Sequence, residues 1–541
     1  MKRRDIIRNL AVIPFAGGIL PHSAMGGVDT LLSGQDSGPL QIGPKIYESI
    51  GVDPVINCRG TFTIIGGSLE RPEVLAASKA AAAYFVQYDE LAFGVGKRLA
   101  EITGAEWGMV SSGCAAGLKH VAAACVTGGN PEKLIRIPNL TGMENTEVII
   151  PGYSRNPYDH AIRNIGVTII TVETAEELAQ AINPRTAMIY LMSGRGSEKG
   201  QPLSLEVIAG MAKPKNIPVL VDAAAEILTI PNVHLEQGAT VVAYSGGKAI
   251  CGPQCAGLLL GKKDLLMAAW QASSPHHGPG RDNKVGKEEM LGMLAAVEAW
   301  LTRDHNAEWK TWLTWLDNIA RRVLKIQGVE TDIHEPTDLS NRSPVLSISW
   351  DPDKLHITAE EVAENFARTK PRIAIGARTR DGRTSLSVTT GQMQPGNDKI
   401  VADRIFDVLS QKRKPRSEEL TPASVNIAGH WDVTVEYFTS KSQHSLYIEQ
   451  DGNWLQGSHH SDFTVQEIVG MVEGDQVRMR SNIRIPGSGV TYLFSGTATA
   501  DSMEGSIYLG EYLNAKFTAG KTVYLKERAK ITIPGGPPLA T

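Results

Sequence analysis

Two apolar stretches of this 541-residue chain each lead into a residue that can carry chemistry. The run 218–221 ends at Asp222, and the run 240–244 continues through Ser245-Gly246-Gly247 into Lys248. In open α/β sheets, ligands bind at the carboxyl ends of the strands. An acid and a desolvated amine at that edge predict proton transfer and nucleophilic attack on a carbonyl group.

A third segment has the composition of a phosphate-binding loop. Ser112, Gly113 and Cys114 follow the apolar run 107–110 and precede a helical pattern over 118–126. The free N–H groups at the start of a helix bind phosphate, and a glycine lets the backbone approach a ligand closely. Many strand-to-helix turns have this composition, so the loop is informative only together with the acid and the lysine.

The order of these three segments matches the requirements of pyridoxal phosphate (PLP). An enzyme that uses this cofactor needs a lysine for a Schiff base, an acid beside the pyridine nitrogen and N–H groups for the phosphate. Taken singly, Asp222 is explained as the cap of a turn, and Lys248 as a solvated charge. The ordered series is harder to obtain by chance, and it predicts PLP as the cofactor.

The sequences of these segments resemble the fold-type I PLP enzymes, and in detail their selenocysteine-synthase-like branch. That branch includes D-glucosaminate-6-phosphate ammonia lyase and related dehydratases. The resemblance covers about residues 46–412. Its most specific pieces lie at residues 56–61, 66–69, 89–91, 103–106, 112–113, 158–161, 221–224, 245–248, 252–254 and 284–289.

The resemblance implies roles for individual residues. It makes Lys248 the Schiff-base lysine and Asp222 the partner of the pyridine nitrogen. It places His160 on the face of the cofactor ring, although a core histidine bonded to backbone is the alternative reading. The further cofactor contacts that it implies are Ser112, Gly113, Cys114, Ser245 and Arg281. Arg281 would reach the phosphate of a neighbouring subunit, unless it is ordinary surface charge.

A substrate carboxylate needs a planar, bidentate donor, which is usually an arginine. Arg372 and Arg378 lie where related enzymes place this residue in the small domain, and Arg59 is a third candidate. The sequence does not choose among the three.

The resemblance favours a PLP-dependent lyase that acts on an amino acid or an amino sugar acid. Lys248 would remove the α-proton, and loss of a β-leaving group followed by hydrolysis would give ammonia and a keto product. Two alternatives stay open: a class V-like aminotransferase, and a non-catalytic protein of the same fold that only binds its ligand. The ammonia-lyase relatives act on phosphorylated sugars inside the cell, so an exported chain argues against a phosphosugar substrate.

The expected architecture is α/β, with a fold-type I PLP-transferase large domain, a small α+β domain and a C-terminal antiparallel β-barrel. Over 46–323, β-branched runs alternate with amphipathic stretches behind an N-terminal arm, which predicts a mostly parallel, doubly wound sheet. A long helical stretch over 287–323 leaves this domain, and residues 324–412 form the small domain. After a charged linker at 413–424, period-two alternation over 425–530 resembles a lipocalin-like barrel.

The two ends of the chain are expected to lie outside these domains. Residues 1–25 resemble a twin-arginine export signal, because Lys2, Arg3, Arg4 and Arg8 precede an apolar stretch. This predicts a periplasmic or otherwise exported protein, and a cytoplasmic protein with a basic N-terminal helix is the alternative. Residues 26–45 are expected to be a linker or arm, and residues 531–541 a tail.

Composition limits the partners. A net charge of −4 without a basic stripe argues against nucleic acid, and past the N-terminus no apolar run approaches the length of a membrane span. His276-His277 and His459-His460 lack the spacing of metal ligands, so no metal site is expected. The five cysteines are an odd number, which argues against a full disulfide framework. The expected partner is a small-molecule amino substrate, and the resemblance adds a homodimer or higher homo-oligomer.

Overall fold

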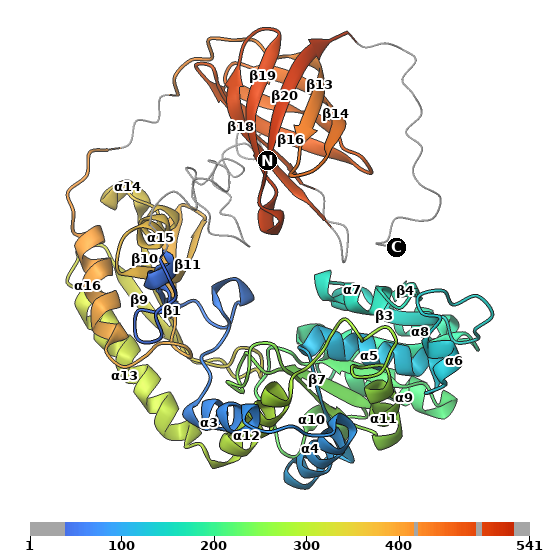
Figure 1. Ribbon diagram of the computed structural model, residues 1–541. Coiled ribbons are helices and arrows are strands. Elements are labelled where there is room, and N and C mark those ends of the chain that lie inside the picture. Colours follow the sequence, from blue (N-terminus) through green and yellow to red (C-terminus); the bar gives the residue numbers. More distant parts are fainter. Residues whose placement is uncertain (1–37, 416–419, 483–488, 524–541) are drawn as a thin grey trace.

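The computed structural model describes residues 38–415, 420–482 and 489–523. The predicted export signal, most of the predicted arm, part of the predicted linker and the predicted tail lie outside the described residues. The structure has three units, each built on its own sheet (Figure 1). The predicted fold class is confirmed: a mostly parallel α/β sheet is followed by a smaller α+β unit and a closed antiparallel barrel.

The first unit is a seven-stranded sheet with the strand order β2-β8-β7-β6-β5-β3-β4. All pairings are parallel except those of β8, which runs antiparallel to both β2 and β7. The strands are β2 (Trp107–Ser111), β3 (Glu147–Pro151), β4 (Thr168–Val172), β5 (Thr186–Met192), β6 (Val219–Asp222), β7 (Val241–Ser245) and β8 (Gly257–Gly261). Most strand residues are buried, as expected of a sheet covered on both faces.

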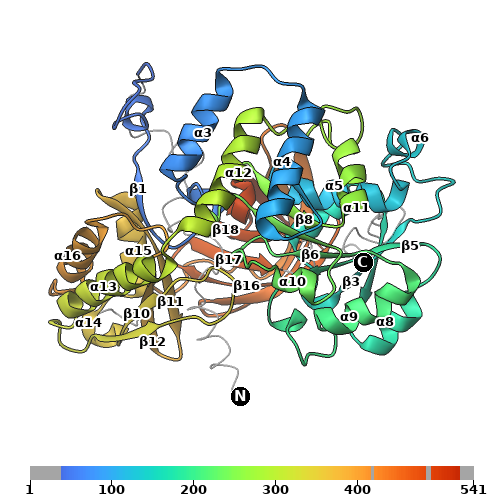
Figure 2. The same ribbon diagram turned by 90° about the horizontal axis from the view of Figure 1, so that it is seen from below.

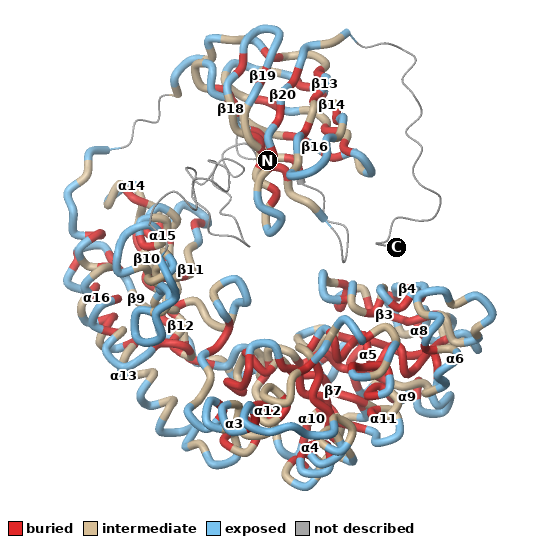
Figure 3. The backbone as a smooth tube through the Cα atoms, in the orientation of Figure 1, coloured by how far each residue is buried: buried red, intermediate tan, exposed pale blue. Residues whose placement is uncertain are grey.

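Helices cover both faces of this sheet (Figure 2). One face carries α4 (Tyr88–Thr103), α5 (Cys114–Thr127), α11 (Lys263–Gln271) and α12 (Lys287–Thr302), and α3 (Pro72–Ala82) packs on α12. The other face carries α8 (Ala175–Ala181) and α9 (Leu205–Ala212). Three short helices complete the unit: α6 (Pro131–Leu134), α7 (His160–Arg163) and α10 (Val233–Glu236). The burial pattern shows α5 as the central helix of the core (Figure 3).

The helical stretch predicted over 287–323 is two helices in the structure. The first helix, α12, ends at Thr302, and α13 (His305–Val323) begins three residues later. Asp304 caps α13 by accepting a hydrogen bond from the Ala307 N–H at 2.9 Å. Arg303, in an extended conformation between the helices, pairs with Glu308 at 2.9 Å. The side chains of this junction therefore stabilise a break that amphipathic periodicity alone does not reveal.

The small unit is a five-stranded sheet with the order β1-β11-β12-β10-β9. Its first strand, β1 (Val55–Cys58), comes from the start of the chain and pairs parallel to β11. The other strands are β9 (Glu330–His334), β10 (Val345–Trp350), β11 (Arg372–Arg380) and β12 (Arg383–Thr389), and the helices are α13, α14 (Pro352–Leu355), α15 (Ala359–Arg368) and α16 (Asn397–Leu409). The chain thus enters the small unit first, crosses to the large one and returns.

The third unit is a closed eight-stranded barrel in which β13 pairs with β20. Its strands are β13 (Gly429–Glu436), β14 (Lys441–Asp451), β15 (Trp454–His460), β16 (Val465–Glu473), β17 (Gln476–Asn482), β18 (Thr491–Ala498), β19 (Ser502–Tyr508) and β20 (Asn514–Thr522). Inward side chains such as Trp431, Phe494 and Phe517 form its core. Closure removes the unpaired strand edges that an open sheet would expose.

A chain of polar groups lies inside one half of this barrel. His444 Nδ1 is 2.9 Å from His459 Nε2, and His459 Nδ1 is 2.9 Å from Ser481 Oγ. Ser481 in turn donates to Gln466 Oε1 at 2.8 Å. Burial lowers the pKa of His444, and it lowers the pKa of His459 to about 3. Both rings are therefore neutral in the folded barrel, each with one donor and one acceptor nitrogen.

We expect acid to destabilise the barrel through these rings. An unfolded histidine has a pKa of about 6.5, whereas burial holds the folded His459 at about 3. The neutral ring therefore contributes fully to the free energy of unfolding at a pH above the unfolded pKa. This contribution is lost as the pH falls from the unfolded pKa toward the folded pKa, by up to roughly 1.4 kcal/mol for each pH unit. Pulse proteolysis in urea across this range, read on barrel peptides, measures the slope. His459→Gln should flatten it, and a flat wild-type profile contradicts the prediction.

Across the described residues, the structure has no helix that is both long enough and apolar enough to cross a membrane.

Candidate active site

The centre of the site is the carboxylate of Asp222, which is buried at the carboxyl end of β6. Its Oδ1 accepts from the Ala224 N–H at 3.0 Å and lies 3.7 Å from Cys114 Sγ at the start of α5. Burial raises the pKa of Asp222, while these donors and the nearby positive charge of Lys248 lower it. Because the effect of burial is the larger one, the site favours a further positive charge beside this carboxylate.

Tyr190 is a contact of Asp222 that sequence reasoning missed. Its hydroxyl donates to Asp222 Oδ2 at 3.0 Å, and the Asn156 side-chain amide donates to that hydroxyl at 3.3 Å. Tyr190 lies on β5, next to β6 in the sheet, and is fully buried. The feature of the sequence that could have revealed it is a tyrosine within the otherwise apolar run 188–191. A tyrosine hydroxyl that is buried in a strand needs a hydrogen-bond partner.

Lys248 lies in a tight turn after β7. The Gly246 N–H donates to Ala256 O, and the Gly252 N–H donates to Gly246 O, both at 2.8 Å. The two glycines before the lysine have no room for side chains, because a Cβ on Gly246 would lie 2.8 Å from Pro253 O and one on Gly247 would lie 2.8 Å from Gln254 Cα. The packing of this turn on residues 252–256 thus fixes where the Lys248 backbone lies.

The predicted phosphate loop joins β2 to α5. Gly113 is the N-cap of α5 with a φ of 86°, and no side chain caps this helix. The loop lies directly on β8, where a Cβ on Gly257 would come within 2.6 Å of the Cys114 backbone nitrogen. The α5 N-terminus is therefore open to an anion, and Cys114 connects it to Asp222.

His160 is the first residue of α7 and is exposed. Two buried ion pairs hold the segment around it: Asp159 binds Arg155 at 2.7 Å and Arg163 at 2.9 Å. The predicted role of His160 as a ring-stacking residue stays a prediction, since the structure gives its position but no contact with Asp222 or Lys248.

The remaining predicted cofactor contacts lie at different distances from the lysine turn. Ser245 is the last residue of β7, and its N–H donates to Ala224 O at 3.3 Å, beside Asp222. Arg281 is exposed in the loop before α12, where its guanidinium is 3.5 Å from Ser274 Oγ. The structure therefore groups Ser245 with the acid and the lysine, and it leaves Arg281 on the surface.

The three candidate substrate arginines lie in different environments. Arg372 donates to Ala367 O at 2.7 Å and is held against the end of α15. Arg378 is exposed on β11. Arg59 follows β1, its guanidinium carbon lies 4.4 Å from the centre of the Phe62 ring, and burial lowers its pKa. The loop that it begins continues to Ser68, whose N–H donates to Gly247 O at 2.9 Å, next to Lys248.

A second buried carboxylate anchors the turn that follows Asp222. Glu226 Oε2 is 2.6 Å from His234 Nε2, and Glu226 Oε1 accepts from the Ser193 hydroxyl at 2.5 Å. The same turn binds the small unit, because the Asn341 N–H donates to Ala225 O at 2.8 Å. Glu226 thus ties the ends of β5 and β6 together where the two units meet, and sequence reasoning did not single it out.

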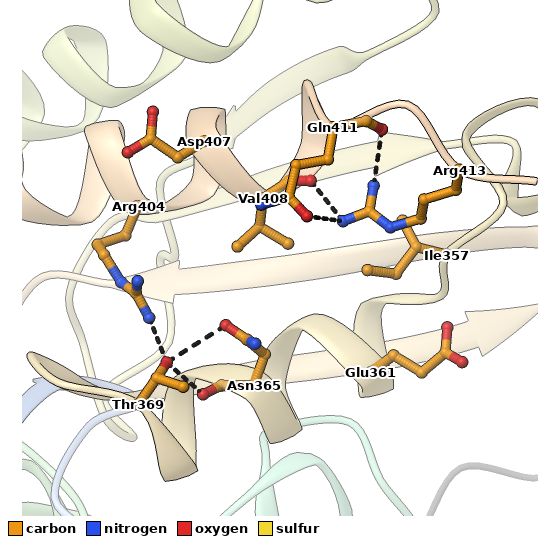
Figure 4. Close-up of a pocket in the computed structure, with 9 residues that line it drawn as sticks. All are labelled: Ile357, Glu361, Asn365, Thr369, Arg404, Asp407, Val408, Gln411 and Arg413. Atoms are coloured by element: carbon orange, nitrogen blue, oxygen red, sulfur yellow. Dashed lines mark hydrogen bonds between the residues drawn. The ribbon is translucent and has the colours of Figure 1, made fainter.

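A separate pocket of about 400 Å³ lies on the small unit between α15 and α16 (Figure 4). Its two guanidinium groups have structural partners: Arg404 donates to Thr369 Oγ1 at 2.5 Å, and Arg413 donates to Val408 O, near the end of α16, at 2.6 Å. None of the predicted site residues lines it. We therefore assign this pocket no part in the chemistry around Lys248.

Comparison with known proteins gives this constellation a family. The model of the family Aminotransferase class-V matches residues 157–281, which include Asp222 and Lys248. D-glucosaminate-6-phosphate ammonia lyase from Salmonella typhimurium (strain 14028s / SGSC 2262) is 33% identical over 301 residues, 54% of this chain and 79% of that protein. The chain belongs to this ammonia-lyase family of fold-type I PLP enzymes. It is thus an enzyme of the lyase or aminotransferase type, as the resemblance predicted.

Two further proteins are similar to this chain over most of their own length. A 5'-C-glycyluridine monooxygenase-decarboxylase from Streptomyces sp is 27% identical over 376 residues, 67% of this chain and 92% of that protein. A solved structure of D-glucosaminate-6-phosphate ammonia-lyase superposes with a TM-score of 0.61 at 27% identity, covering 68% of this chain and 99% of that one. The whole length of that relative is thus matched by about two thirds of this chain.

The site residues fit the cofactor of the ammonia-lyase family. A protonated pyridine nitrogen would supply the positive charge that the buried Asp222 carboxylate favours, and Tyr190 and Cys114 would orient that carboxylate. The uncapped N-terminus of α5 suits a phosphate group. Lys248, at the end of the neighbouring strand, would hold the cofactor covalently.

Removing the Tyr190 hydroxyl should weaken cofactor binding. Tyr190→Phe deletes a hydrogen bond that orients the Asp222 carboxylate. Because this bond is already formed in the apoprotein, only part of its value of about 1.5–3 kcal/mol is lost on binding, and we expect the dissociation constant to rise by up to roughly tenfold. The pKa of Asp222 should rise further, because this bond lowers it. Titration of the apoprotein with PLP, followed by the quenching of tryptophan fluorescence, gives the dissociation constant.

Tyr244→Phe is the matched control for this change. Tyr244 is a buried tyrosine on β7, and its hydroxyl accepts from the Asn232 amide at 2.7 Å but does not contact Asp222. The Tyr244→Phe variant should lose about as much stability as Tyr190→Phe while keeping its affinity for PLP. Equal affinity losses in both variants would contradict a specific role for Tyr190.

Proposed function

We propose that this protein is a PLP-dependent lyase that eliminates the β-substituent of an amino acid or amino sugar acid and releases ammonia and a keto product. The observation that carries the proposal is the buried Asp222 carboxylate, whose surroundings favour a cationic partner, next to the lysine turn. The likeness to an ammonia lyase supports elimination over other PLP chemistry.

Each residue of the site has a role in this proposal. PLP, when bound, withdraws electrons from the substrate's α-carbon and so makes its proton acidic. Asp222 keeps the pyridine nitrogen protonated, and Tyr190 fixes the direction of its carboxylate. Lys248 takes the α-proton on its Nζ atom, and the same amine can return a proton to the departing group.

Arg59 is our choice for the substrate carboxylate among the three arginines. It lies at the end of β1, in the loop that also contacts the Lys248 turn, and burial has partly removed its water. Arg372 is bonded to the end of α15, and Arg378 lies further along β11 in solvent. A half-buried guanidinium forms stronger bonds to a carboxylate than a fully hydrated one.

A product assay tests the proposed reaction. Holoenzyme is mixed with amino acids and amino sugar acids that carry a β-hydroxyl group, with and without phosphate, and ammonia and keto acid are measured without an amino acceptor. Loss of the α-proton and the β-hydroxyl removes one water, and hydrolysis of the resulting imine restores it, so ammonia and keto acid should form in equal amounts. A keto product that forms only after a keto-acid acceptor is added would replace the lyase with the aminotransferase, the activity after which the matched class-V family is named.

We further propose that the protein is a homodimer. The connection between α3 and α4 exposes Tyr84, Phe85 and Val86, a cluster of apolar surface that is unusual on a monomer. Light scattering coupled to size-exclusion chromatography should give twice the chain mass. Phe85→Ser should shift the protein toward the monomer, whereas a wild-type monomer at micromolar concentration would contradict the proposal.

We propose that the chain is exported through the twin-arginine route. The basic cluster and the following apolar stretch in residues 1–25 support this. Cell fractionation of the wild type and of an Arg3→Lys, Arg4→Lys variant tests it, since loss of both arginines should retain the protein in the cytoplasm. Equal distribution of the two proteins would count against export by this route.

A further inference from the structure

The two ends of the barrel differ in the side chains that they expose. The connections 437–440, 461–464 and 509–513 lie at one end, because successive antiparallel strands alternate in direction. In the described part of the barrel, the large apolar side chains that this end exposes are Phe438, Phe463, Val465, Tyr512 and Leu513. We call these five residues the barrel rim. Toward the opposite end, the exposed large apolar side chains among the described residues are Val523 and, on the outer wall opposite His430, Tyr447.

The barrel's own interior does not explain this rim. Directly beneath it, the buried rings pack against one another, with the ring centres of His459 and Phe494 5.4 Å apart and those of His459 and Tyr492 4.8 Å apart. The chain from His444 to Gln466 satisfies its own hydrogen bonds. The interior of this end is therefore filled, and the apolar rim faces outward, where such a surface marks a site of contact.

A second exposed apolar surface lies on the loop that contacts the Lys248 turn. Residues 61–69, the entrance loop, contain the short helix η2 (Thr63–Ile65) and expose Phe62, Ile64 and Leu69. The loop is part of the site, because the Ser68 N–H binds Gly247 O at 2.9 Å and the Leu69 N–H binds Gln392 Oε1 at 3.0 Å. This loop thus connects Arg59, which lies against the Phe62 ring, to the turn that carries Lys248.

The barrel is placed and tethered so that its rim can reach this entrance. In Figure 1 the end that carries η7 (Gly510–Tyr512) points toward the gap between the two catalytic units, and in Figure 2 the barrel lies behind that same gap. Residues 410–428 separate α16 from β13. At its barrel end this segment is bonded to the barrel, because the Asn453 amide donates to Thr421 O at 2.6 Å and the Ser424 N–H donates to Gly474 O at 2.8 Å.

We propose that the barrel rim docks on the entrance loop of its own chain and forms one wall of the catalytic entrance. Burial of two apolar surfaces drives the contact, and the covalent tether raises their effective concentration. Docking excludes water from the side of the site where Arg59 lies, as lids do in other enzymes. This contact depends on neither the cofactor nor the reaction, so it stands or fails independently of the proposed lyase activity.

A photo-crosslink tests the contact in the full-length protein. The change Ile64→p-benzoylphenylalanine places a photoreactive group on the entrance loop, at an exposed position that is 74% accessible. Irradiation should join this residue to peptides from 437–440, 461–465 or 509–513 within one chain, at the mass of a monomer on a denaturing gel. A link to a second chain, a link to any other surface, or no link would overturn the proposal.

Matched variants at the two ends of the barrel make the test specific. Phe438→Ser with Phe463→Ser should lower the yield of the crosslink at least about tenfold, since both changes remove large apolar side chains whose burial drives the contact. Val523→Ser, at the opposite end, should leave the yield unchanged. Circular dichroism establishes that the barrel remains folded in both proteins. An equal loss of yield in both variants, or no loss in either, would contradict docking through the rim.

Discussion

Lys248→Ala will abolish the visible absorbance band of the purified holoenzyme and reduce turnover by at least about two orders of magnitude. The band arises when the cofactor's aldehyde is joined to a lysine, and Lys248 is the lysine that the turn after β7 holds near Asp222. General acid–base catalysis alone contributes about 10²–10⁴-fold, and this variant also loses the covalent attachment. The measurements are the absorbance spectrum and the rate of ammonia release.

Two comparisons make this result interpretable. Lys215→Ala removes an exposed lysine of the same unit and should change neither the spectrum nor the rate. Added methylamine should restore part of the rate of Lys248→Ala, because a free amine can occupy the space of the missing side chain. A normal band in Lys248→Ala would assign the covalent role to a different lysine and refute the proposed site.

Asp222→Asn will weaken cofactor binding by about 3 kcal/mol or more, which is over a hundredfold in the dissociation constant. The change preserves the shape of the side chain but removes the charge that would pair with the protonated pyridine nitrogen. Turnover should fall even at saturating PLP, because a neutral partner no longer keeps that nitrogen protonated. Titration of the apoprotein with PLP and rates at saturation measure the two effects separately.

The stability of the apoprotein distinguishes this effect from misfolding. Burial raises the pKa of Asp222, so the ionised carboxylate is an unfavourable group in the apoprotein at neutral pH. Asp222→Asn should therefore melt at the same temperature as the wild-type apoprotein or above it, while its affinity for PLP falls. Asp264→Asn, an exposed site on α11, should change neither quantity. A lower apoprotein melting temperature with unchanged affinity would refute the pairing.

The Asp222 turn connects the small unit to the site by hydrogen bonds. The segment from Asp222 to Glu226 contacts the cofactor region on one side and residue Asn341 of the small unit on the other. The pair between Glu226 and His234 on α10 fixes the position of this segment. Movement of the small unit would therefore be transmitted to the carboxylate by backbone hydrogen bonds rather than through solvent.

Several features of the fold could be predicted from the sequence because they depend on local patterns. Apolar runs predicted β3 to β7, since a strand buried on both faces must be apolar throughout. Period-two alternation with regular glycines predicted an antiparallel barrel, and its closure agrees with that prediction. The loop, acid and lysine were found by their order along the chain, because each follows a strand that ends at the same edge of the sheet.

Other features depend on contacts between distant segments and were decided by the tertiary structure. Tyr190 and Asn156 become partners of Asp222 only because β5 lies beside β6, which no local pattern reports. Arg59 lies beside the small-unit sheet because β1 pairs with β11 across more than 300 residues of chain, and the loop after it contacts the lysine turn through Ser68. The sequence alone thus determined the kinds of strands and the order of the chemical groups. Packing decided which side chains surround the acid, because burial and hydrogen bonding are properties of neighbours in space.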